Sequence, residues 1–184
     1  MEITKQLAHV MFEENLFIRE VEQSADGKQY FSTIIVDGQH PYLYENAAIA
    51  NHVSGTTFLD VCRQLLKAIS HLSQGNPIDN RFVIRNVSMD FARWTKIGVP
   101  VQIVAEVTPQ WTKIRGQDCI NYVASVNYYQ EGRLTCAMTG QYSTFPGAIE
   151  ELLMGRQYRQ APLPPAAAKL AAATLADAAC QEAV

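Results

Sequence analysis

Four polar side chains recur along one predicted helix at spacings that place them on a single face. The helix is predicted from about Thr56 onward, and Asp60, Gln64, Lys67 and His71 follow at intervals of four, three and four residues, which brings side chains together on a helix. The helix is otherwise apolar nearly all round, through Phe58, Val61, Cys62, Leu65, Leu66, Ala68, Ile69 and Leu72. Such a helix must be wrapped by other structure. A carboxylate in a wrapped helix costs roughly several kcal/mol unless it is paired or used, so Asp60 is the first candidate for acid–base or nucleophilic chemistry.

The loop before this helix supplies the second candidate. It reads Asn51-His52-Val53-Ser54-Gly55 and leads into a threonine that we expect to cap the helix. His52 is suited to proton exchange near neutral pH. Each candidate also has a structural interpretation. Asp60 can simply favour the helix N-terminus, and His52 can hydrogen-bond a loop carbonyl.

Composition limits the function classes. A chain of 184 residues with 48% hydrophobic residues has room for one sizeable core. The formal charge of −3, without any run of Lys or Arg, argues against a nucleic-acid surface. The N-terminus lacks the apolar stretch of a signal peptide, and no segment reaches the length of a membrane span. The expectation is a cytoplasmic protein.

The cysteines are expected to pack in the core. Cys62, Cys119, Cys136 and Cys180 show no CxxC spacing, and three of them fall in apolar periodic segments. This pattern is typical of small core residues in a reducing compartment. We expect neither a disulfide set nor a metal site.

Long strands account for most of the remaining chain. Residues 29–36 are rich in β-branched and aromatic residues, and apolar and polar residues alternate over 83–91, 99–107, 120–128 and 134–142. The last two runs flank Glu131-Gly132, which predicts a hairpin. One buried helix followed by long antiparallel strands indicates the α+β class, with a sheet wrapped around a helix.

The C-terminal part differs in composition. Pro162-Leu163-Pro164-Pro165 predicts a stiff linker, and the residues from Ala166 onward are mostly alanine with few large apolar side chains to bury. We therefore predict one domain over residues 1–160 and a Pro/Ala-rich tail over residues 161–184.

Several short motifs together resemble the A-factor biosynthesis hotdog domain family. They occur in the family's order and span roughly residues 8 to 145: Ala8-His9-Val10, Glu14-Asn15-Leu16-Phe17-Ile18, Gln39-His40-Pro41-Tyr42-Leu43-Tyr44, His52-x-x-Gly55, Asp60, Arg63-Gln64 and His71. The resemblance implies a hotdog fold, which belongs to a superfamily of thioesterases and dehydratases. The family's usual glutamate is Asp60 here. The chain has room for one hotdog, whereas butyrolactone-forming members carry two, so a site shared between units implies a homodimer.

The resemblance also implies work on acyl thioesters carried on coenzyme A or an acyl carrier protein, with no further cofactor. In that picture the Gly55 and Thr56 amides hold the thioester carbonyl, as helix N-terminal N–H groups can. Asp60 is the base or nucleophile, and His52 exchanges a proton with the substrate or leaving group. Gln64 orients substrate or water. Arg63 either binds substrate or pairs with an acid across a dimer.

Three functions remain open from the sequence. The first is transfer of an acyl group, such as a β-ketoacyl group, to a small alcohol in secondary-metabolite or fatty-acid-derived biosynthesis. The second is thioester hydrolysis or dehydration. The third is a non-catalytic acyl-binding or scaffold protein. Hydrolysis needs a water-accessible Asp60, dehydration needs His52 and an acid at one substrate carbon, and binding alone needs neither.

Overall fold

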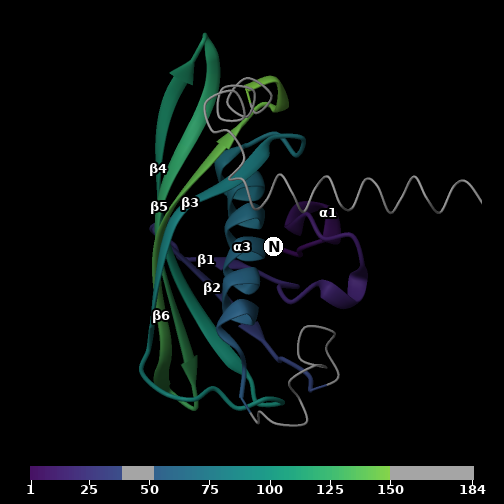
Figure 1. The fold of residues 1–184 in the computed structure, drawn as a ribbon, viewed down its shortest axis with the longest axis vertical. Helices are drawn as coiled ribbons and strands as arrows, with labels where there is room; N and C mark the ends of the chain where they lie inside the picture. Colours follow the sequence, from purple (N-terminus) through teal and green to yellow (C-terminus); the bar gives the residue numbers. More distant parts are fainter. Residues whose placement is uncertain (39–51, 150–184) are drawn as a thin grey trace, which may run out of the picture. The chain divides into compact units, whose positions relative to one another are not determined.

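The long helix α3, Gly55–Gln74, lies along one face of a six-stranded antiparallel sheet (Figure 1). The computed structural model describes residues 1–38 and 52–149. The fold is that of the compact unit Met1–Gly147; a second unit, Ala148–Val184, has only residues 148 and 149 described. The predicted α+β class, a helix enclosed by an antiparallel sheet, is confirmed. The predicted boundary at residue 160 and the tail lie outside the described residues.

The sheet has the strand order β1-β2-β4-β5-β6-β3. Its strands are β1 (Glu22–Gln23), β2 (Gln29–Ile34), β3 (Arg81–Phe91), β4 (Val101–Ile114), β5 (Gln117–Gln130) and β6 (Arg133–Phe145). The short helix α1 (Lys5–Ala8) and the 3-10 turn η1 (Glu13–Asn15) precede them. Strand β3 returns beside β6 and forms one edge of the sheet, and none of the described strands pairs with its outer side.

Two tight hairpins join the three longest strands. Glu131 and Gly132 have φ of 52° and 71°, and Arg115 and Gly116 have φ of 52° and 80°, as expected for two-residue turns whose twist matches the flanking strands. The hairpin at Glu131-Gly132 is therefore confirmed. The other was missed, because the predicted strands end near residue 108 and resume at 120. Side chains between these positions are mostly exposed, so no apolar alternation marks them.

The core lies between α3 and the sheet. The sequence predicts that eight apolar side chains of the helix are enclosed by other structure. Seven of them are buried, and only Leu72, at 37% exposure, is not. The Tyr128 hydroxyl donates to the Phe58 carbonyl at 3.1 Å, and the Tyr142 hydroxyl lies 3.3 Å from the Cys62 sulfur. Burial raises the pKa of the Cys62 thiol to about 11. Cys62, Cys119 and Cys136 are buried free thiols, and Cys180 lies outside the described residues.

Residues 1–21, here called the N-terminal segment, cover the side of α3 that faces away from the sheet (Figure 1). Their apolar side chains join the same core as the helix, through Ile3, Ala8, Leu16, Phe17, Ile18 and Val21. The helix is therefore enclosed on both sides, and the polar line of Asp60 and Gln64 meets the N-terminal segment.

Candidate functional site

The start of α3 is set by Ser54. Ser54 has extended backbone angles, and its hydroxyl accepts a hydrogen bond from the Thr57 amide at 3.3 Å. The predicted threonine cap is therefore wrong. Ser54 caps the helix, which begins at Gly55, and serine caps at least as well as threonine. Thr56 is exposed in the first turn, with its hydroxyl 2.8 Å from that of Ser54.

A cavity of about 830 Å³ opens at this helix end. We call it the α3 pocket, and its lining includes His52, Gly55, Phe58, Phe91, Trp94 and Arg133. The aromatic side chains of Phe58 and Phe91 in its lining are here called the floor, and the N-terminal turn of α3 forms one wall. At Gly55 an added Cβ would lie 3.2 Å from the Phe91 ring, so a larger residue there would press against that ring and take up pocket space.

His52 sits in this wall, on a short ladder with the loop after β3. It forms an isolated antiparallel bridge with Lys96, and the Val53 amide donates to the Thr95 carbonyl at 2.8 Å. The imidazole meets the Trp94 indole edge-on, with ring centroids 4.1 Å apart. Both rings therefore border the same space.

Basic side chains form part of the pocket lining. Arg93, Lys96 and Arg133, here called the basic rim, line the cavity together with one acid, Glu131. Lys96 pairs with Glu131 at 3.6 Å, and both side chains are more than 60% exposed. The rim keeps an excess of positive charge, which attracts anionic ligands such as phosphates.

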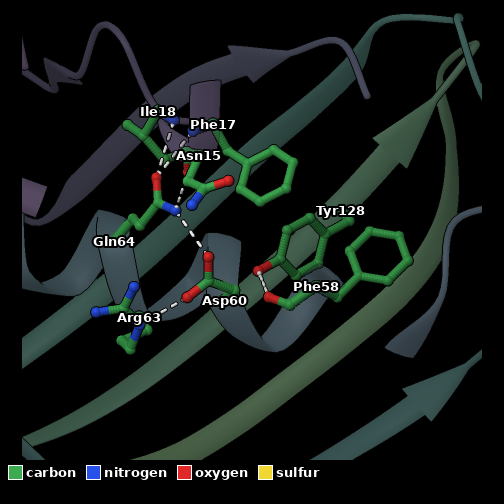
Figure 2. A network of polar contacts seen from close by, with 8 residues as sticks. All are labelled: Asn15, Phe17, Ile18, Phe58, Asp60, Arg63, Gln64 and Tyr128. Carbon is green, nitrogen blue, oxygen red and sulfur yellow. Dashed lines mark hydrogen bonds and ion pairs between the residues drawn. The ribbon is translucent and has the colours of Figure 1, made fainter. Parts of the chain in front are cut away.

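Asp60 lies in a different setting, a polar network with Arg63 and Gln64 (Figure 2). Arg63 donates through Nε to Asp60 Oδ1 at 2.7 Å, and Gln64 donates through Nε2 to Oδ2 at 2.8 Å. The Asp60 and Arg63 side chains are 15% and 27% exposed. Each carboxylate oxygen thus has its own donor, and the carboxylate still reaches solvent.

Gln64 is fully buried and hydrogen-bonded on both sides of its amide. Its Oε1 accepts from the Phe17 amide at 2.9 Å and the Ile18 amide at 3.5 Å, and its Nε2 also donates to the Asn15 carbonyl at 2.8 Å. The predicted contact of Gln64 with substrate or water stays a prediction. The observed contacts are with Asp60 and the backbone of the N-terminal segment.

The predicted site residues thus fall into two groups. His52 and Gly55 line the α3 pocket, whereas Thr56, Asp60, Arg63 and Gln64 are not in its lining. Helix geometry explains the division, since Asp60 is turned by roughly 200° from Phe58 on a helix of 3.6 residues per turn. Within one chain, the described residues do not bring His52 and Asp60 into one cavity.

A third polar cluster, at the other end of the line, was not predicted as a unit. His9 Nε2 lies 2.8 Å from His71 Nε2, and His71 Nδ1 lies 2.8 Å from the Asn76 carbonyl. Burial, and then the Lys67 charge, lowers the pKa of His9 to about 4. Burial, and then Arg63, lowers the pKa of Lys67 to about 8. Both histidines stand in family-like motifs, but sequence spacing cannot show that they meet. His40 lies outside the described residues.

Over the described ranges, no helix is both long and apolar enough to cross a membrane. In the same part of the chain, no cluster of three or more His, Cys, Asp or Glu residues is arranged to hold a metal ion.

Two solved structures share this architecture. Thioesterase superfamily member 2 from zebrafish matches with a TM-score of 0.50 and 18% identity, over 78% of this chain and 92% of that one. Protein yhdA from Lactococcus lactis matches with a TM-score of 0.50 and 14% identity, over 75% and 99%. At such identities the likeness shows the fold, and the described unit is a single hotdog.

The family follows from the sequence itself. A model described as the A-factor biosynthesis hotdog domain matches residues 1–146. The chain belongs to this family, as its motifs predict. No curated protein matches the sequence.

Proposed function

We propose that this protein is a hotdog enzyme that acts on an acyl thioester and transfers the acyl group to a small alcohol. The observation that carries the proposal is the α3 pocket, which joins an apolar floor, a helix N-terminus and a basic rim. An acyl chain suits the floor, and the phosphates of coenzyme A or of a carrier-protein arm suit the rim.

The chemistry proposed for the pocket uses the first turn of α3. The amides of Gly55 and Thr56 have no partner within the helix, because they belong to its first turn. Such donors stabilise the negative charge that develops on a thioester oxygen under attack. His52, which borders the pocket, would pass a proton to the departing thiolate.

The nucleophile's base is the remaining requirement, and we propose that it comes from a second copy of the chain. Asp60 lies outside the pocket of its own chain but is partly exposed and held by two donors. Strand β3 is a long edge that pairs on its outer side with none of the described strands, and Val83, Val87 and Phe91 on it are exposed. Such a surface favours pairing with another chain. A twofold dimer would complete two identical sites.

Mixed dimers test this arrangement. Gly55→Leu fills the pocket and Asp60→Asn removes the carboxylate, so each homodimer should be nearly inactive. Co-expression at equal amounts should restore about a quarter of wild-type turnover, because half of the dimers are mixed and each has one intact site. Absence of any recovery in verified mixed dimers would argue that both residues act within one chain. A monomer in light scattering would exclude the shared site.

Hydrolysis is the second candidate, and the exposure of Asp60 favours it because water can reach the carboxylate. A panel of acyl-coenzyme A and acyl-carrier thioesters, with and without glycerol-type acceptors, separates the two. Transfer gives an ester by mass spectrometry and a thiol-release rate that depends on the acceptor. Hydrolysis gives free acid at a rate that does not. Binding without thiol release would support the non-catalytic alternative and overturn the enzyme proposal.

A further inference from the structure

The Gln64 side chain links the N-terminal segment to the Asp60 carboxylate. Its amide carbonyl accepts from the backbone of residues 17 and 18, and its amide nitrogen donates to the Asn15 carbonyl and to Asp60 Oδ2 (Figure 2). All of these bonds are made by a side chain with 0% exposure.

The partners fix which way the amide points. A reversed amide would set its NH2 group against two backbone N–H groups and its oxygen against a carbonyl and a carboxylate, so only the observed orientation satisfies every partner. With two acceptor positions and two donor hydrogens engaged, Gln64 has no capacity left for a substrate or water. A role at the reacting atoms would require breaking at least one of these bonds in a buried setting, which is costly.

We propose that Gln64 is a positioning residue that couples docking of residues 15–18 to the orientation of the Asp60 carboxylate. This rests on the proposed role of Asp60 in thioester chemistry. Arg63 holds Oδ1 from the more exposed side, and Gln64 holds Oδ2 from the buried side. The N-terminal segment is thus part of the support of the catalytic base, because the amide that orients the base is itself fixed by that segment.

Gln64→Glu separates the two halves of this role. Glutamate has the same shape and keeps an oxygen for the amides of residues 17 and 18, but it lacks the hydrogens donated to Asn15 and Asp60. We expect kcat to fall at least about tenfold with KM within about twofold, because only an orientation is lost. The ratio of variant to wild-type kcat should rise as pH is lowered from about 8 to about 5.5, since the introduced carboxyl group regains a donor when it is protonated.

A matched control separates positioning from general stability. Ile69→Val shortens a fully buried side chain on the same helix outside the network, so it should lower the melting temperature and leave kcat and its pH profile unchanged. A Gln64→Glu enzyme with wild-type kcat at temperatures well below melting would overturn the proposal. So would a loss of kcat that shows no recovery at lower pH.

Hydrogen exchange tests the coupling without any activity. Asp60→Ala removes one restraint on the Gln64 amide, so exchange of the Phe17 and Ile18 amides should speed up about fivefold, the change expected for one net hydrogen bond. Asp118→Asn, at an exposed hairpin, should leave them unchanged. Unchanged exchange in Asp60→Ala overturns the coupling even if the enzyme is active. Faster exchange in a protein without thioester turnover keeps the coupling and rejects the proposed function.

Discussion

The α3 pocket and the Asp60 network lie on opposite sides of the same helix, and they are built in opposite ways. The pocket lining includes side chains with large exposed fractions, such as Trp94 at 75% and Phe91 at 53%. The network has Gln64 at 0% exposure, with defined partners for both carboxylate oxygens of Asp60. The pocket provides volume and positive charge, whereas the network fixes the orientation of the Asp60 carboxylate.

This difference separates two tasks that a site for acyl chemistry must combine. A pocket that accepts an acyl chain and a phosphate-bearing arm needs room and adaptable walls. A base needs a defined position relative to the proton that it removes. Because the α3 pocket and Asp60 lie on opposite faces of α3, the pocket can stay open while Asp60 is held rigidly. The proposed second copy of the chain would then bring the two together.

Loss of the Asp60 charge should have the largest effect. We expect Asp60→Asn to lower turnover at least about a hundredfold. The new amide can still accept from Gln64 but offers no carboxylate to Arg63, so stability should fall by only about 1 kcal/mol. Steady-state kinetics and urea unfolding of one preparation check both numbers. Full turnover would show that the network is purely structural, and the base would then be sought in the pocket, at His52.

Removal of His52 should have a smaller effect, which sharpens the division of roles. His52→Ala is expected to lower kcat by about tenfold to a hundredfold, the range of a proton donor whose task water can partly replace. The amides of α3 would still hold the carbonyl. Use of a thioester with a more acidic thiol should reduce the loss. An equal loss for both thiols would mean that His52 shapes the wall instead of moving a proton.

The basic rim should affect binding and leave the chemical step alone. The double variant Arg93→Ala, Arg133→Ala is expected to raise KM for a coenzyme A thioester several-fold with kcat nearly constant. The difference from wild type should shrink as salt is raised, because exposed charges are screened. A KM that is independent of salt in both proteins would remove the rim from substrate recognition.

The smallest predicted effect concerns pH and the N-terminal segment. The pKa of His9 is lowered from 6.5 to about 4, so the unfolded chain binds the proton more readily between these values. Stability should therefore be lost as pH falls from about 6.5 to about 4. Because His9 is only partly buried, we expect about 1 kcal/mol after discounting for solvent screening. Urea unfolding across this range should show the loss in wild type but not in His9→Gln. Parallel curves would contradict it.

The sequence predicted the elements better than their mutual placement. The apolar run of α3, the alternation in β5 and β6 and the turn at Glu131-Gly132 are local patterns. They can be predicted because each depends only on residues that are close together in the sequence. The grouping of His52 with Asp60 was inferred from motif order. The angle between Phe58 and Asp60 around the helix follows from spacing alone, but the sequence does not show which of the two faces borders the pocket that His52 lines.

No local sequence pattern predicts that the N-terminal segment docks on Gln64. Three of the four bonds that Gln64 makes go to backbone atoms of residues 15, 17 and 18, and backbone groups are present at every position of any sequence. The contact of His9 with His71 joins residues 62 positions apart. Both contacts depend on the path of the chain across α3, which periodicity does not encode.

The two tryptophans of the chain give the pocket an optical reporter of its own. Trp94 borders the α3 pocket with its indole against His52, while Trp111 lies on β4 and is not among the pocket's lining residues. In a Trp111→Phe protein, all tryptophan emission would come from the pocket wall. Entry of an acyl chain would displace water from that indole and move its emission to shorter wavelength, so occupancy could be followed in real time with an unlabelled ligand.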